Sequence, residues 1–295
     1  MSFRYWLVLF ALLPAFAEPA LAGGGAWNLK KGGYYIKIGL TSLTADESYG
    51  FDGSRQPIFP DTANFRGGNF GVTDVALYGE LGITDWLTGV ASTQYKVAVR
   101  QGLYRPTERD STSSASGLGD LWLTARMKLL PDDEPVVATL MLGWKLPTGS
   151  PLQDIPLGTG VVDYEAAVAV GSGFPVIGDM YGYGQISGGY RLRNAASNEM
   201  NFLAEFGVNL SHDLLVHTIV DGTYTNADFS PALNDPANPE MIRHFRNEQS
   251  FTRWMIGAIY AAADDMEINV GYEKYSGGRN IIAGSGISVG IAWKQ

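Results

Sequence analysis

The chain has 295 residues, a formal net charge of −9, no cysteine and only 17% charged residues. The absence of cysteine excludes disulfides, thiol nucleophiles, Cys-ligated metal sites and a lipoprotein anchor. The acidic balance argues against a nucleic-acid partner, which would require a basic face. Glycine supplies 37 residues, well above the usual share of about 7%, and aromatic residues make up 12% of the chain. This composition is typical of an all-β protein.

Residues 1–22 have the pattern of a secretory signal peptide. Arg4 supplies a positive charge, residues 5–16 form an apolar stretch, and Ala20-Leu21-Ala22 is a small-residue cleavage motif. The apolar stretch is shorter than the roughly 20 residues that a membrane-spanning helix needs. We therefore expect export, cleavage after Ala22, and one mature domain over residues 23–295.

Alternation of apolar and polar residues predicts β-strands along the rest of the chain. The clearest alternation covers residues 34–41, 74–81, 87–97, 120–128, 162–170 and 287–294. Weaker alternation covers residues 136–146, 180–193, 200–210, 214–224, 251–260 and 266–275. The count is about twelve strands, with ten or fourteen as alternatives. No apolar run after the signal is long enough for a spanning helix, so any membrane crossing must use strands closed into a barrel.

The expected connections alternate in length along the chain. Long ones cover residues 45–70, 100–117, 147–160, 194–199, 225–250 and 276–280, and short ones lie at 83–85, 131–133, 174–178, 211–213 and 262–265. Bacterial outer-membrane barrels have short periplasmic turns and longer outer loops. The sequence thus predicts a transmembrane antiparallel up-and-down β-barrel in the outer membrane of a Gram-negative bacterium. The loop at 225–250 is interpreted either as a constriction at the mouth or as a mobile surface loop.

Aromatic residues near strand ends are interpreted as interfacial girdles, although ordinary β-propensity also favours them. They are Trp27, Tyr34, Trp86, Tyr95, Trp144, Tyr164, Tyr224, Trp254, Tyr260, Tyr272 and Trp293. The short segment before the first strand could not form a plug domain, but it has the length to enter the lumen. The alternation also turns a second aromatic set inward: Tyr35, Tyr78, Trp122, Tyr181 and Tyr183.

Charged residues fall in the inward phase of the predicted strands. A charge on the lipid face near the midplane would cost about 2–4 kcal/mol, so the phase identifies the inner face. The candidate pore-lining residues are Lys37, Glu80, Lys96, Arg126, Lys145, Glu165, Arg191, Glu205, Arg253 and Glu267. Further inward charges are Asp120, Lys128, Asp163, Arg193, Asp221 and Glu273. Two interpretations stay open, a charged pore lining or an ion-pair network that fills a narrow barrel.

A lipid-modifying enzyme is the rival class, because some outer-membrane barrels hydrolyse lipids. Such catalysis would need a nucleophile and a base within hydrogen-bonding reach. The chain has three histidines, and His212 stands between Ser211 and Asp213 in an expected turn. Adjacent residues seldom form a triad, which is a spatial arrangement. The acidic clusters at 132–134 and 264–265 are interpreted as solvated turn residues, not metal ligands. We expect no enzyme activity and no cofactor; a structural or adhesion barrel is the third class.

Several short motifs occur in a recognisable order. They are residues 26–34 (AWNLKKGGY), 79–87 (GELGITDWL), 117–121 (GLGDL), 145–149 (KLPTG) and 157–160 (LGTG) followed by Asp163. Together they resemble the outer-membrane barrels described as transporters of the phenol meta-degradation pathway. The resemblance implies passive passage of small, hydrophobic or aromatic molecules, and it assigns no binding residues. The expected partners are the lipid bilayer with its lipopolysaccharide, the barrel-assembly machinery and a small-molecule solute.

Overall fold

The computed structural model describes residues 25–58, 65–104, 107–153, 155–178, 180–194, 196–225 and 248–295. The predicted signal peptide, residues 1–22, and most of the loop predicted at 225–250 lie outside these ranges. No helix in the described part of the chain is long and apolar enough to cross a membrane.

The described elements are all β-strands. In chain order they are β1 (Tyr34–Ala45), β2 (Glu47–Tyr49), β3 (Arg55–Pro57), β4 (Phe65–Thr84), β5 (Leu87–Tyr104), β6 (Arg109–Leu118), β7 (Leu121–Lys128), β8 (Val137–Leu146), β9 (Asp163–Pro175), β10 (Tyr181–Arg193), β11 (Glu199–Asn209), β12 (Leu214–Thr225), β13 (Ser250–Ala263), β14 (Met266–Arg279), β15 (Ile281–Ile282) and β16 (Ser285–Lys294).

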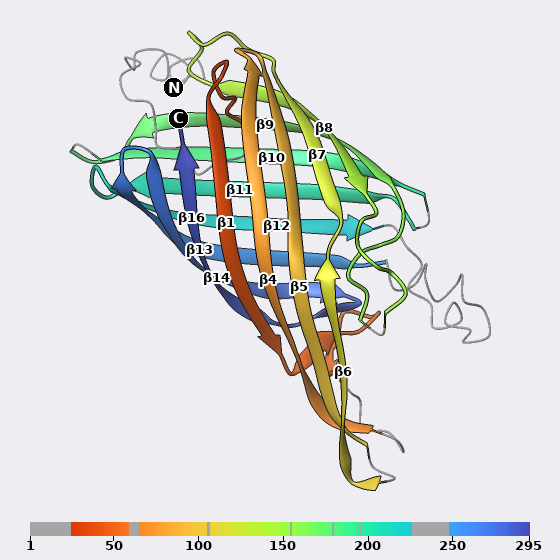
Figure 1. Cartoon of the computed structure of the whole chain (residues 1–295). Helices are drawn as coiled ribbons and strands as arrows, with labels where there is room; N and C mark the ends of the chain where they lie inside the picture. The colour runs from red at the N-terminus through yellow and green to blue at the C-terminus, as the bar shows by residue number, and fades with distance from the viewer. Residues whose placement is uncertain are drawn as a thin grey trace, which may run out of the picture.

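One antiparallel sheet closes on itself to form a barrel (Figure 1). Of its 13 strands, β6 and β7 share a single position, because both pair with the same edge of β5. The first and last strands pair from Tyr35↔Lys294 to Thr44↔Ser285, and β4 pairs with both β1 and β5. The barrel therefore has twelve strand positions in up-and-down order, which confirms the predicted fold. β2, β3 and β15 form a separate three-stranded sheet.

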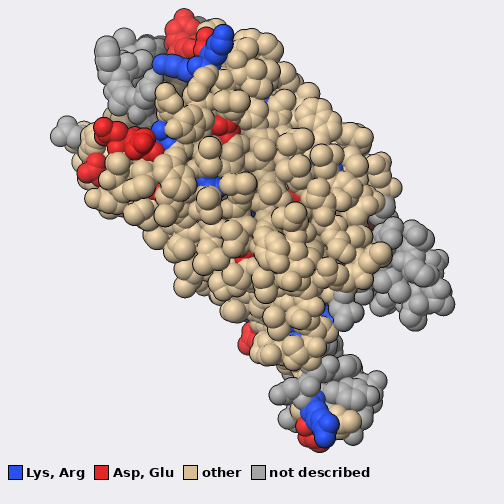
Figure 2. Space-filling model, viewed as in Figure 1, with Lys and Arg blue, Asp and Glu red and all other residues tan. Residues whose placement is uncertain are grey.

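The outer surface of the barrel is apolar and the inner surface is polar. On β1, Ile36, Ile38 and Leu40 are 42%, 47% and 44% exposed, whereas the intervening Tyr35 is 4% exposed. Figure 2 shows a broad band of uncharged side chains, with most charged groups gathered at the two ends. Such a surface is unfavourable in water and matches the apolar band of a membrane-spanning barrel.

The strands of one region extend well beyond the predicted limits. The segments 45–70 and 100–117 were expected as loops, but β4 begins at Phe65 and β5 continues to Tyr104, paired with β6. These strands project as a long hairpin beyond the rest of the barrel, at the end opposite the labelled termini (Figure 1). The prediction failed here because β6 carries Ser and Thr on both faces, so its sequence does not alternate between apolar and polar residues. Its backbone nevertheless pairs with β5 along its whole length.

Exposed aromatic side chains lie near both ends of the spanning strands. Tyr95, Tyr164 and Tyr224 are near the end that carries the hairpin, and Trp86 and Tyr260 are near the opposite turns. These positions fit the girdles expected of a barrel at the two membrane interfaces. Trp27, which was assigned to the same set, lies inside the barrel instead and is described below.

Candidate functional site in the barrel lumen

The lumen contains a series of ion-paired clusters. Nine of the ten candidate pore-lining residues are less exposed than their neighbours along the strand, and the tenth, Arg253, joins the inner face through its partners Asp221 and Glu273. In the first cluster, Arg126 on β7 donates to both carboxylate oxygens of Glu80 on β4, at 3.0 and 3.1 Å. Tyr78 also donates to Glu80. The side chains of Arg126 and Glu80 are only 4% and 2% exposed, so neither charge could be buried without the other.

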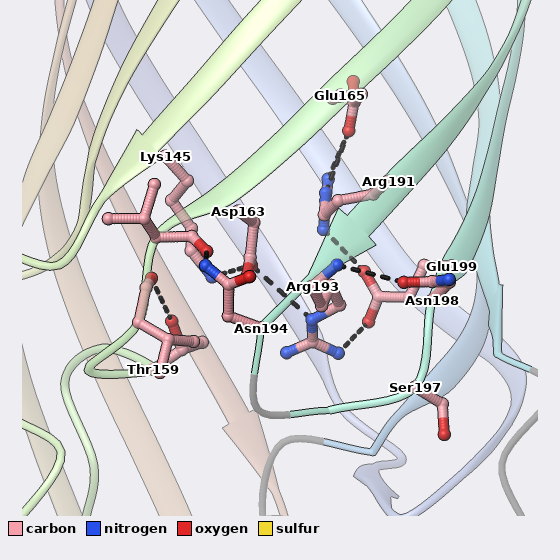
Figure 3. Close-up of polar contacts among 12 residues, drawn as sticks. Lys145, Thr159, Asp163, Glu165, Arg191, Arg193, Asn194, Ser197, Asn198 and Glu199 are labelled. Carbon is pink, nitrogen blue, oxygen red and sulfur yellow. Dashed lines mark hydrogen bonds and ion pairs between the residues drawn. The ribbon is translucent and has the colours of Figure 1, made fainter.

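A second cluster lies where β8 to β11 end, next to the outer loops (Figure 3). Arg191 lies between two carboxylates, with Nη2 2.8 Å from Glu165 and Nη1 2.7 Å from Glu199. Arg193 contacts Glu199 and lies 3.5 Å from Asp163. Lys145 donates to the same Asp163. The Arg191 guanidinium also stacks 4.6 Å above the Trp122 ring. The network joins five neighbouring strands.

Two smaller clusters lie on the opposite part of the wall. Arg253 on β13 binds Asp221 on β12 at 2.8 Å and Glu273 on β14 at 2.7 Å. Its guanidinium is 5.9 Å from the Tyr275 ring centroid. On the neighbouring strands, Lys37 donates to the Asn269 side chain at 3.2 Å, and Lys294 contacts Glu267. Lys96 is directly opposite Asp74 in the β4–β5 ladder.

Glu205 on β11 gathers three neighbouring side chains. It accepts hydrogen bonds from the Tyr183 hydroxyl at 2.5 Å and from Gln185 Nε2 at 2.6 Å. His217 Nδ1 is 3.2 Å from the same carboxylate. This cluster fixes Gln185, whose side-chain oxygen accepts a hydrogen bond from the backbone N–H of Ala26 at 2.8 Å. The segment before β1 is therefore bound to the lumen wall.

The segment from Gly25 to Gly33 crosses the lumen, with turns at residues 25–26 and 31–32. It starts from the β4–β5 turn, where the Lys31 N–H donates to Asp85 at 3.0 Å. The Leu29 N–H then donates to the Thr88 hydroxyl at 3.0 Å, and Arg126 donates to the carbonyl of Trp27 at 2.9 Å. The segment was expected to be long enough to enter the lumen, and the structure places it there.

Trp27 occupies a closely fitting site on the far wall. Its ring meets Tyr183 edge to face, with centroids 5.7 Å apart, and packs against the buried Leu215 and Ile259. A Cβ atom added to Gly171 would lie 2.6 Å from the indole, so a side chain at this position would collide with the ring. Its prediction as a girdle residue was wrong, because a tryptophan outside the strands has no face assigned by alternation.

The described charges are therefore mostly engaged with one another across strands. This arrangement agrees with the ion-pair interpretation of the inner face, since each pair compensates the desolvation of its members. Arg191 and Arg253 keep 21% and 24% of their side chains exposed, so both can also meet a solute. A role of the ten candidate residues in lining a pore stays a prediction.

The inner residues that the sequence analysis missed are Gln185, Glu199 and Asn269. Each is a polar residue of the lumen network and is buried, with 7%, 4% and 7% of its surface exposed, respectively. Their inward phase along β10, β11 and β14 was available as a signal. Only the cross-strand register shows what they contact, because the partners come from other strands.

In the part of the chain that the structure describes, neither a nucleophile–base pair nor a metal site is assembled around the histidines. His212 is almost fully exposed and bonds only to its neighbour Asp213, while Ser211 accepts a hydrogen bond from the Asp213 backbone. Asp213 holds the pKa of His212 above its ordinary value through this hydrogen bond. His217 is bonded to Glu205 and has no serine partner among the described contacts. Within the described ranges, no three potential metal-ligating side chains come together.

Comparison with known proteins gives similarity in structure and none in sequence. No family model matches the chain, and no curated protein matches it. The crystal structure of an outer membrane channel from Pseudomonas putida F1 superimposes with a TM-score of 0.61 at 12% identity, covering 93% of this chain and 100% of that one. The transport unit of the autotransporter AIDA-I from Escherichia coli gives 0.51 at 7% identity, covering 95% and 93%. These similarities establish the barrel fold.

Proposed function

We propose that this protein is an outer-membrane channel through which small molecules pass passively, and that its cargo is hydrophobic or aromatic. The main supporting observation is the polar, charge-balanced lumen inside a closed barrel with an apolar exterior. A barrel that served only as an anchor would not need a lumen in which arginine side chains stay partly exposed. The structural similarity to a bacterial outer membrane channel agrees with this proposal.

The preference for aromatic cargo is supported by three inner-face sites. Arg191 stacks on Trp122, Arg253 lies beside Tyr275, and the indole of Trp27 is held against Tyr183 inside the lumen. Guanidinium groups and ring edges both attract aromatic faces. The last of these sites already binds an aromatic ring, which belongs to the chain itself.

The test is single-channel conductance of the refolded protein in a planar bilayer, followed by competition with aromatic acids and with sugars. A steady current that aromatic acids block and sugars do not would support both parts of the proposal. A current that both solute classes leave unchanged would refute the preference for aromatic cargo. A properly folded, heat-modifiable barrel that carries no current would refute the open channel and favour a structural role for the protein.

A further inference from the structure

The loop between β8 and β9 closes on itself. It covers residues 147–162, all described except residue 154. The Leu157 N–H donates to the Ser150 carbonyl at 2.9 Å. A Cβ atom on Gly149 would lie only 2.8 Å from the Cα of Gly158, so the two arms of the loop touch. Compact loops with adjoining ends pack as independent surface units.

Asp120 joins the two arms of this loop where they meet, at residues 149 and 158–159, which we call the neck. One carboxylate oxygen accepts a hydrogen bond from the Gly149 N–H at 3.1 Å, and the other accepts from the N–H and hydroxyl of Thr159, at 2.9 and 3.1 Å. A Cβ atom on Gly158 would lie 2.2 Å from the same carboxylate, so glycine is required there. Lys145, 3.9 Å away, compensates the charge of Asp120, whose side chain is 8% exposed.

Three motifs of the sequence meet at this neck. Residues 117–121 bring Asp120 into the break between β6 and β7, residues 145–149 form the first arm, and residues 157–160 form the second. The Thr148 hydroxyl donates to the Gly119 carbonyl at 2.6 Å and ties the first two motifs together. The motifs are far apart in sequence but form one structural unit.

The loop lies on the lumen side of the barrel wall. Leu157 and Ile155, 2% and 9% exposed, pack against Ala98 on β5 and Ala115 on β6. Ala98 has the same phase along β5 as the inward-facing Lys96, and it is opposite Ala115. The loop therefore covers the inner surface where the projecting hairpin leaves the barrel, beside the junction of β6 and β7 (Figure 1).

We propose that the described residues 147–153 and 155–162 form a fixed constriction at the outer mouth, clasped by Asp120, which limits the size of the solutes that enter. Leu152 of this loop is 80% exposed, whereas Ile155 and Leu157 are buried. A hydrogen bond from Asn194 to the Val162 carbonyl at 2.9 Å joins the loop to the charged cluster around Asp163 and Arg193 (Figure 3). An exposed apolar side chain beside paired charges favours small amphipathic solutes over large hydrated ones. This inference rests on the proposed channel function.

The test replaces residues 150–157 with two glycines. Because Gly149 and Gly158 already touch, a short bridge joins them without moving β8 or β9. We expect the conductance to rise about twofold or more and larger neutral polymers to enter the pore. Asp120→Ala, which frees the neck but keeps every loop residue, gives the same direction of change and serves if the shortened variant does not fold.

Asp52→Ala is the matched control. Asp52 also fixes an outer turn through its carboxylate, accepting from the Ser54 N–H at 2.9 Å and from its hydroxyl at 2.6 Å, but it belongs to a different loop. It should leave conductance and the size limit unchanged. A conducting parent whose size limit stays the same in both loop variants would overturn the constriction and leave the channel function standing. If neither the parent nor the variants carry current, both the channel function and the constriction are refuted. Current from the shortened variant alone supports the constriction.

Discussion

Trp27→Ala tests how the segment inside the lumen is held. The substitution removes the indole from its contacts with Tyr183, Leu215 and Ile259 but keeps the backbone hydrogen bonds on either side. Truncation of a packed tryptophan typically costs about 3–5 kcal/mol. We take the lower end, about 3 kcal/mol, because a lumen admits water. Since each 1.4 kcal/mol is a factor of ten, the unbound fraction of the segment should rise about 100-fold.

The assay is thiol labelling at Ala26→Cys. Ala26 is 1% exposed, and the chain has no cysteine of its own, so the introduced thiol is unique and shielded. Labelling occurs only when the segment leaves its site, and its rate should therefore follow the unbound fraction. Gly171→Ala should have the same direction of effect, because its Cβ atom would lie 2.6 Å from the indole.

Trp86→Ala is the control for this experiment. Trp86 is 55% exposed, and its backbone carbonyl, which accepts a hydrogen bond from Asn28 of the segment at 3.3 Å, is retained in the alanine variant. Its removal should leave the labelling rate at Ala26→Cys unchanged. If Trp27→Ala labels within twofold of the parent, the indole does not hold the segment and the reasoning is refuted.

Three other predictions concern the barrel wall and one of its turns. Arg126→Met should lower the free energy of unfolding by about 3–5 kcal/mol, because Glu80 is left buried without its partner, and adding Glu80→Gln should restore part of the loss in urea titrations. Ile38→Lys places a charge on the lipid face and should cost about 2–4 kcal/mol; an unchanged unfolding midpoint would contradict the assigned face. Asp213 raises the pKa of His212, so this pair stabilises the fold below the ordinary histidine pKa and loses that effect as pH rises through the raised value. NMR titration should show a lower His212 pKa in Asp213→Asn, and an unchanged pKa would count against the hydrogen bond.

The sequence by itself determined the barrel and the inner face of its wall. Lipid cannot satisfy backbone polar groups, and it strongly disfavours charge, so alternation along β1, β9 and β16 had to encode which side faces outward. That pattern is local, with a period of two residues, and can be read from one strand at a time. It predicted the limits of the weaker strands, such as β10 and β12, to within a residue or two.

Only the tertiary structure decided which inner residues meet. Arg126 reaches Glu80 and Arg253 reaches Glu273 because of strand register, which alternation within one strand does not specify. The projecting hairpin escaped prediction because β6 carries Ser and Thr on both faces and therefore shows no alternation. Trp27 lies outside the alternating segments, and the inward phase of Asp120 does not reveal that its carboxylate binds Gly149 and Thr159. Their roles follow from contacts that exist only once the barrel has closed.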